Sequence, residues 1–190
     1  MSRKPKYIGG TKNKIIESAT KLFFENGYDG TSVRSIVKSV DCEVGLFYYY
    51  YRSKDSLFSD VIDNFFVPYD KKFDELVEFA KADPANGLYH FFDELKIVVK
   101  EFRDKYAENM HRTVRWAIRE HTLTSLEPYI EEIVKLAIAN GASPAMEVKT
   151  TAVFMSHGVG SLVLREDSQA VEDMSADIRK SIDILMNFKK

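Results

Sequence analysis

The sequence contains few of the residues and patterns that mark disulfide-bonded or membrane proteins. Its one cysteine, Cys42, cannot form an internal disulfide, which predicts a reducing compartment. No stretch reaches the roughly 18 uninterrupted apolar residues of a membrane span. The basic opening "MSRKPKYIGG" is not followed by the apolar region of a signal peptide. We therefore expect a cytoplasmic protein with no membrane partner.

Motifs of catalysis and metal binding are also lacking. The sequence has no glycine-rich phosphate loop and no nucleophile elbow. Glu108 and His111 have the Glu-x-x-His spacing of iron ligands in helical bundles, but such a site needs a second copy. None of His90, His121 and His157 has a glutamate three residues before it. We predict no enzyme activity, no metal site and no cofactor.

Charge is distributed unevenly along the chain. Residues 1–54 carry ten Lys and Arg against five Asp and Glu, a net charge of +5, whereas residues 55–190 carry seventeen against twenty-four, a net charge of −7. A basic head on an acidic body favours a polyanion as the partner of the head. A solvated basic tail is the alternative.

Apolar residues recur with helical spacing along almost the whole chain. In "TKNKIIESATKLFFENG", Ile15, Ala19, Leu22 and Phe23 form one helix face that ends before Gly27. Two short helices follow, over about 31–40 and 43–50. No β-alternation is present, so we predict an all-α fold with a head over residues 1–54 and a larger body over 55–190. Further helices are expected at 53–80, 84–103, 105–120, 123–140, 144–165 and 170–188.

The stretch "VGLFYYYYRSKDSLF" (residues 44–58) has four consecutive tyrosines. On a helix, Phe47, Tyr50 and Tyr51 point to one side, while Tyr48 and Tyr49 point largely to the other. We expect the first group to be buried. The second group would offer hydroxyls to phosphate oxygens. The alternative is that all four tyrosines simply pack.

A helix, a short helix, a tight turn and a second short helix form a helix-turn-helix arrangement. The segment "GYDGTSVRSIVKSVDCEVGLFYYYYRSKDSLF" (residues 27–58) resembles the DNA-binding signature of the TetR/AcrR family of bacterial transcriptional regulators. The resemblance implies a helix-turn-helix DNA-binding domain followed by a helical effector-binding and dimerisation domain. It further implies a homodimeric repressor that a small effector releases from a palindromic operator. The aromatic residues of the body, described below, make a hydrophobic or aromatic effector the expected one. The alternative is a helical enzyme or small-molecule-binding protein with an incidental helix-turn-helix-like head.

The resemblance also assigns contacts to double-stranded operator DNA. Ser32 would cap the second helix and touch phosphate, Arg34 would reach a base edge or phosphate, and Lys54 would open the fourth helix against the DNA backbone. Glu43 departs from the usual Ser or Thr; it either accepts from a cytosine amino group or favours the helix N-terminus. Gly45 permits close approach to either the duplex or the second helix. The expected DNA-binding residues are Ser32, Val33, Arg34, Glu43, Val44, Gly45, Leu46, Tyr48, Tyr49 and Lys54.

Two residues before the third helix have simpler interpretations. Asp41 stands where the family usually has a turn glycine, and Asp enters the left-handed region more easily than most residues. Cys42 is either a redox switch or a small buried apolar residue, and we favour the second interpretation.

The body predicts an effector site and a dimer interface. Aromatic residues in its middle helices suggest an apolar pocket near Trp116, lined by Phe66, Tyr69, Phe92, Tyr106, Met110, His111, Arg115, Trp116 and Glu120. Two apolar stripes suggest an isologous four-helix interface. Its expected residues are Val148, Ala152, Met155, Val159, Leu162, Ile178, Ile182 and Leu185.

Overall fold

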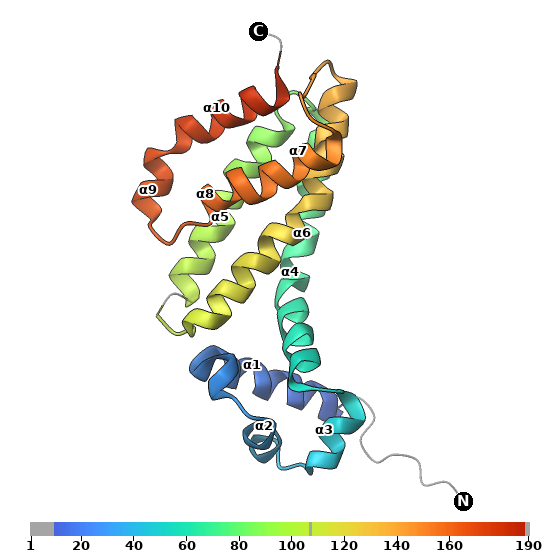
Figure 1. Ribbon diagram of the computed structural model, residues 1–190, viewed down its shortest axis with the longest axis vertical. Coiled ribbons are helices and arrows are strands. Elements are labelled where there is room, and N and C mark those ends of the chain that lie inside the picture. The colour runs from blue at the N-terminus through green and yellow to red at the C-terminus, as the bar shows by residue number, and fades with distance from the viewer. Residues whose placement is uncertain (1–9, 107, 189–190) are drawn as a thin grey trace, which may run out of the picture. The chain divides into compact units, whose positions relative to one another are not determined.

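The computed structural model describes residues 10–106 and 108–188, and every regular element in these ranges is a helix (Figure 1). The all-α class is therefore confirmed. The described chain forms two compact units. Unit 1 runs up to Val67 and also includes Glu108–Ile118, whereas unit 2 comprises the remaining residues. Unit 1 thus extends beyond the expected boundary at residue 54 and takes in a segment from much later in the chain.

Unit 1 is built on the apolar face of its first helix. Ile15, Ala19 and Phe23 are completely buried, as their spacing predicts. Gly27 has φ +75° and ends the regular part of this helix, also as predicted. The elements of unit 1 are α1 (Gly10–Gly30), α2 (Val33–Ser39), α3 (Val44–Tyr50) and the beginnings of α4 (Lys54–Ala82) and α6 (Arg112–Ala139).

The long helix α6 differs from the prediction of two helices at 105–120 and 123–140. The expected break at His121–Thr122 is wrong, because the helix continues through both residues and even through Pro128. His121 and Thr122 each cost only tenths of a kcal/mol in a helix, whereas Pro128 costs about 3 kcal/mol. The burial of Leu126 and Ile130 on the inner face outweighs that cost.

The later helices of unit 2 are shorter than predicted. The expected helix at 144–165 is divided into α7 (Val148–Phe154), a π-helical turn η1 (Met155–Val159) and α8 (Gly160–Val163). The expected helix at 170–188 is divided at Met174 into α9 (Ser168–Asp173) and α10 (Ser175–Met186). Unit 2 also holds α5 (Gly87–Tyr106) and the remaining parts of α4 and α6. Among the described residues, none of the helices combines the length and apolar character that a bilayer crossing requires.

The predicted dimer stripe belongs to the core of unit 2. Its residues Ala152, Met155, Val159, Ile178 and Ile182 are at most 3% exposed and pack in the same cluster as the aromatic core of α4 and α5. The other three, Val148, Leu162 and Leu185, are partly buried against that cluster. The stripe is therefore correct as an apolar face but wrong as a surface for a partner, because one helical period fits both uses.

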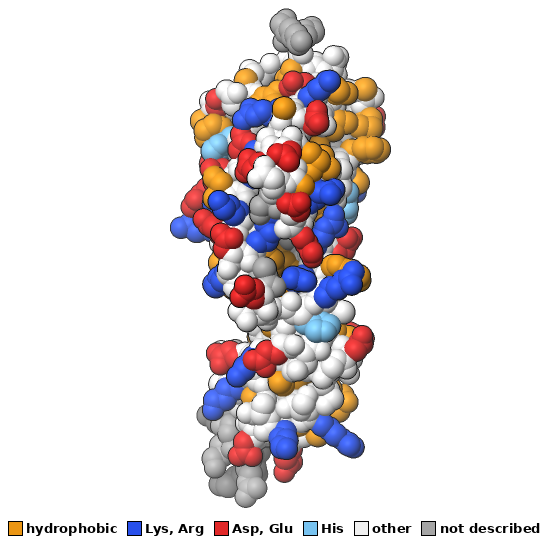
Figure 2. Space-filling view, turned by 90° about the vertical axis from the view of Figure 1, so that its left-hand side faces the viewer, with side chains coloured by type: hydrophobic (Ala, Val, Ile, Leu, Met, Phe, Trp, Pro, Cys, Tyr) orange, Lys and Arg blue, Asp and Glu red, His pale blue; other side chains and the backbone are white. Residues whose placement is uncertain are grey.

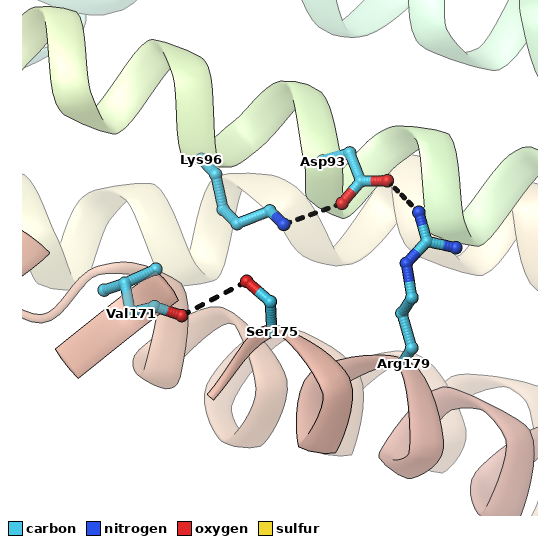
Figure 3. A network of polar contacts seen from close by, with 5 residues as sticks. All are labelled: Asp93, Lys96, Val171, Ser175 and Arg179. Carbon is cyan, nitrogen blue, oxygen red and sulfur yellow. Dashed lines mark hydrogen bonds and ion pairs between the residues drawn. The ribbon is translucent and has the colours of Figure 1, made fainter. Parts of the chain in front are cut away.

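Charged side chains hold α10 against α5 at the surface of unit 2 (Figure 3). Asp93 on α5 accepts from Arg179 on α10, and its other oxygen lies 2.8 Å from the ammonium of Lys96. Tyr89 donates to Asp183 from the same side of α5. Burial, and then this carboxylate, raise the pKa of Tyr89 to about 12. The phenol therefore stays protonated and keeps donating across the physiological pH range.

Gly87 provides a test of the packing in unit 2. A methyl group there would lie 2.7 Å from Cβ of Ala80 and 3.2 Å from its Cα, so α4 and α5 would have to separate. We predict that Gly87→Ala lowers the free energy of unfolding by about 1–3 kcal/mol, the usual cost of overpacking. Urea denaturation measures this loss.

The matched control for this substitution is Gly158→Ala. The added methyl at Gly158 would meet no described atom within 4 Å. The free energy of unfolding of the Gly158→Ala protein should therefore not fall. If the Gly87→Ala protein is as stable as the Gly158→Ala protein, α4 and α5 have room for a methyl group between Gly87 and Ala80.

Candidate nucleic-acid interface

Hydrogen bonds at the end of α1 and the start of α2 fix the first half of the helix-turn-helix. The hydroxyl of Ser32 accepts from Ser35 N at 3.0 Å, while Ser35 Oγ accepts from Ser32 N at 3.0 Å. This reciprocal capping box confirms the predicted cap. Thr31 is buried, and its hydroxyl donates to the carbonyl oxygens of Leu22 and Gly27. The entry of the chain into α2 is therefore closely defined.

A tight turn joins α2 to α3. Asp41 adopts φ +50°, the left-handed conformation predicted for it. The amide of Cys42 donates to Val37 O at 3.0 Å and closes the turn. Partial burial, and then the charge of Asp41, raise the pKa of the Cys42 thiol. A raised pKa disfavours the reactive thiolate, which supports the structural interpretation of this cysteine.

The tyrosines of α3 point in two directions. Phe47 is fully buried and Tyr51 is 4% exposed, whereas Tyr48 and Tyr49 are 57% and 69% exposed. The predicted division is confirmed for these four residues, while Tyr50 is only partly buried. Tyr48 and Tyr49 thus remain open to solvent although the opposite face of the same short helix is packed. The outer face of α3 is thus available to a partner.

The glycine at the start of α3 has space around it. A methyl group at Gly45 would meet no described atom within 4 Å. Close packing of α3 against α2 therefore does not explain why position 45 is a glycine. The other expectation, that a DNA duplex comes close to α3 at this residue, stays a prediction.

Eight exposed residues on or next to α2 and α3 form what we call the α2–α3 surface. It includes the expected residues Arg34, Glu43 and Val44. Two of the expected residues, Val33 and Leu46, are only partly exposed. Sequence reasoning missed Lys38, although its spacing of four residues from Arg34 on α2 predicts a shared face. The α2–α3 surface comprises Ser32, Arg34, Lys38, Glu43, Val44, Gly45, Tyr48 and Tyr49, all exposed.

Lys54 differs from its expected role at the DNA backbone. Its ammonium donates to the carbonyl oxygens of Tyr28 and Thr31 at 2.9 and 3.0 Å, and lies 3.9 Å from the centroid of the Tyr28 ring. The Tyr28 hydroxyl in turn donates to Asp55. Two of the three donors of Lys54 are thus used inside unit 1. The structure gives Lys54 a positioning role, tying the start of α4 to the α1–α2 turn.

His111 and Met110 also differ from their expected place in an effector pocket. The backbone N–H of His111 donates to Phe24 O at 2.6 Å, and a methyl group at Gly27 would lie 2.3 Å from His111 Nδ1. His111 therefore lies against the end of α1 within unit 1. Met110 beside it is buried in the same unit.

The other expected pocket residues are divided between the two units. Trp116 is 54% exposed, and the guanidinium of Arg112 lies 4.3 Å from its ring centroid, which does not fit an enclosed aromatic pocket. Phe92 is 1% exposed and belongs to the core of unit 2. Phe66, Arg115 and Trp116 lie in unit 1, whereas Tyr69, Phe92, Tyr106 and Glu120 lie in unit 2.

A surface groove that the sequence did not predict lies between α4 and α6 of unit 2. It is lined by both acidic and apolar side chains, and Lys81 pairs there with Glu78 at 2.8 Å and Glu132 at 3.5 Å. Ion pairs of the protein itself thus form part of the groove's lining. Its lining residues are Asp74, Val77, Glu78, Lys81, Pro128, Tyr129 and Glu132.

The positioning role of Lys54 can be tested by its removal. Lys54→Ala leaves two carbonyl oxygens without their charged donor, so we predict a loss of roughly 1–3 kcal/mol in the free energy of unfolding. Urea denaturation followed by far-UV circular dichroism measures it. Arg52→Ala, which removes an exposed cation two residues earlier, should leave stability unchanged. If the Lys54→Ala protein is as stable as the wild type but binds DNA more weakly, Lys54 contacts a DNA phosphate, as expected from the sequence.

A protein-family model described as "Bacterial regulatory proteins, tetR family" matches residues 15–61, the part of unit 1 that holds the helix-turn-helix. The chain is 33% identical over 117 residues to the "Probable HTH-type transcriptional regulator YttP" of Bacillus subtilis, covering 60% of this chain and 52% of that protein. It is 42% identical over 55 residues to the biofilm operon negative regulator IcaR of Staphylococcus epidermidis, covering 29% of this chain and 30% of that protein. The HTH-type transcriptional repressor DhaR of a Mycobacterium species is 27% identical over 81 residues, covering 43% of this chain and 41% of that protein. The chain thus spans about a third to a half of the length of these relatives.

Solved structures resemble the whole described fold. The reduced form of NemR from E. coli gives a TM-score of 0.59 at 13% identity, over 90% of this chain and 95% of that one. A TetR-family transcriptional regulator from Pectobacterium atrosepticum gives 0.57 at 14% identity, over 99% and 100%. At such identities the likeness concerns the fold. The family model therefore identifies residues 15–61 as a tetR-family DNA-binding segment, and the solved structures show that the described chain has the helical fold of TetR-family regulators.

Proposed function

We propose that this protein is a transcriptional repressor that binds a palindromic operator as a homodimer and leaves it when a small effector binds. The observation that carries the proposal is the outer face of α3, where Gly45 is unobstructed and Tyr48 and Tyr49 are exposed. The cations of the neighbouring α2 are exposed as well. An α-helix fits the major groove of DNA, which is about 12 Å wide. A cytoplasmic location is part of the proposal.

Charge supports a nucleic-acid partner for unit 1. Arg34 and Lys38 are exposed on α2, and Arg52 is exposed just before α4. The segment 1–54 carries a net charge of +5 on a chain whose total is −2. Attraction to phosphates would steer the α2–α3 surface onto the duplex, and the hydroxyls of Tyr48 and Tyr49 would donate to phosphate oxygens.

Repression, rather than activation, is supported by the relatives. IcaR is named a negative regulator and DhaR a repressor. The matches cover 29% and 43% of this chain, so repression rather than activation is part of the proposal. The effector is proposed to be a small hydrophobic or aromatic molecule. An effector that binds the DNA-free state better than the DNA-bound state lowers operator affinity by that difference.

The test of this function is DNA selection with the purified protein. Duplexes enriched from a genomic pool should share a palindromic sequence, and its affinity should exceed that for random DNA by at least about a thousandfold at physiological salt. Weak, strongly salt-dependent binding without sequence preference would instead support a helical enzyme or binding protein with an incidental helix-turn-helix.

A substitution at Gly45 should affect DNA binding without lowering the stability of the fold. We predict that Gly45→Ala weakens operator binding at least about tenfold, because a methyl group keeps α3 away from the floor of the groove. Its free energy of unfolding should stay constant or rise by up to about 1 kcal/mol, since Ala favours a helix over Gly. Fluorescence anisotropy and urea denaturation measure the two effects. Gly158→Ala, at an equally unobstructed glycine of unit 2, should bind as the wild type does. Unchanged affinity of Gly45→Ala would mean that the duplex does not come near this residue.

Exposed apolar residues of unit 2 offer a new basis for the homodimer. In the space-filling view, hydrophobic side chains gather over parts of unit 2 (Figure 2). Phe154 at the end of α7 is 56% exposed and Ile184 on α10 is 67% exposed, and α10 lies against η1, which directly follows Phe154. The outer sides of these helices are thus left uncovered within one chain. An isologous interface between two copies would cover them.

We predict that Phe154→Glu combined with Ile184→Glu converts the dimer to monomers, because two buried carboxylates per subunit oppose association. Sedimentation equilibrium measures the change in mass. Ile97→Glu, at a 47% exposed residue of α5, is the control and should stay dimeric. A dimer that persists in the double variant would place the interface elsewhere.

A further inference from the structure

We propose that Glu43 reads a cytosine in the operator, where its carboxylate accepts a hydrogen bond from the exocyclic N4 amino group in the major groove. The inference rests on the proposed DNA-binding function, and it assigns a base to one residue of the α2–α3 surface. An acidic residue at the front of a helix that meets a polyanion requires an explanation, because phosphates repel it.

Helix capping does not explain Glu43. The residue is the N-cap of α3, with φ −78° and ψ 149°, and its carbonyl oxygen accepts from Leu46 N at 3.0 Å. Its side chain, however, forms no capping hydrogen bond. Helix α2 in the same unit has a complete capping box from Ser32 and Ser35. A short Ser or Thr would cap α3 better than Glu does. The attraction of an exposed carboxylate to a helix N-terminus contributes only about 0.3–1 kcal/mol, so the carboxylate remains open to a further contact.

Pairing within the protein does not explain Glu43 either. Over residues 10–106 and 108–188, its carboxylate takes part in no hydrogen bond or ion pair. It is exposed, and the next residues on the outer side are Val44, which is 41% exposed, and Gly45. A charge that the protein leaves unpaired at a binding surface is available to a donor on the partner.

The chemistry of the major groove selects the donor. Guanine presents two acceptors and thymine an acceptor and a methyl group, so both disfavour a carboxylate. Adenine presents an amino donor but also the N7 acceptor, which repels a second acceptor. Cytosine presents the N4 amino donor and no acceptor there. A carboxylate at this position therefore prefers cytosine over the other three bases.

The geometry of α3 permits the contact. Glu43 precedes the helix by one residue, where recognition helices direct side chains to base edges. Gly45, two residues later, allows the backbone at this end to come close to the duplex, since a methyl group there would meet no described atom within 4 Å. From this position the glutamate side chain would extend toward the base edges.

The experiment compares base preferences of the full-length protein and three variants, each by selection from randomised duplexes and by anisotropy with single-base operator variants. We expect Glu43→Ala to lose about tenfold discrimination at one C·G pair per half-site, the scale of one base contact. Its affinity for random DNA should rise, because a negative charge is removed. Glu43→Gln should shift the preference at that position toward adenine, since an amide pairs with both N6 and N7 of adenine.

Asp41→Asn is the matched control. Asp41 is exposed two residues before Glu43, and Asn also accepts its left-handed conformation of φ +50°. This variant removes the same charge from the same turn, so its affinity for random DNA should rise similarly while its base preferences stay those of the wild type.

Two results would overturn the inference. If Glu43→Ala and Asp41→Asn both change only the affinity for random DNA, Glu43 acts as a charge and reads no base. If Asp41→Asn shifts base preference as Glu43→Ala does, the effect belongs to the turn and not to a side-chain contact. Failure of the proposed function has a different signature, since the wild-type protein would then select no sequence at all.

Discussion

The helix-turn-helix depends on the contact of one ammonium group with two carbonyl oxygens. Lys54 donates to Tyr28 O and Thr31 O, and these carbonyl oxygens lie where α1 ends and α2 begins. A hydrogen bond from a charged donor is stronger than one from a neutral donor, so the ammonium holds these two carbonyl oxygens of the α1–α2 turn together. Because Lys54 is also the first residue of α4, the same contact fixes where α4 begins beside the α1–α2 turn. The orientation of α2 and α3 relative to the start of α4 follows from it.

A second link joins α1 to a distant part of the sequence. The amide of His111 donates to Phe24 O, and the space for its ring exists because Gly27 has no side chain. Gly27 therefore has two effects: it leaves space for the His111 ring, and its φ of +75° ends the regular part of α1. Both α4 and α6 begin in unit 1 and continue into unit 2. Within unit 1, the start of α4 and the residue before α6 therefore both contact the C-terminal end of α1.

Local patterns predicted the local features of unit 1. The burial of Phe47 and Tyr51, the cap at Ser32 and the left-handed Asp41 each depend on a few neighbouring residues, and all are found. Features that depend on distant residues were not predicted. The carbonyl partners of Lys54 and the place of His111 require knowledge of which segments meet in space. The stripe through Met155 and Ile182 shows the same limit, because helical period identifies an apolar face but not whether the chain itself or a second copy covers it. The break expected at His121–Thr122 failed because tertiary burial outweighs weak local propensity.

The discontinuity of unit 1 has a consequence for how such proteins exchange parts during evolution or in engineered chimeras. The family match covers residues 15–61, yet the compact unit also contains Glu108–Ile118. A single crossover near Val67 would join an α1 from one parent to a His111 segment from another. The residue at position 27 from one parent and the residue at position 111 from the other would then fit together only by chance. Any residue with a Cβ at position 27 displaces the His111 ring. Grafting a new DNA specificity onto this body therefore requires transfer of two separate stretches of the gene.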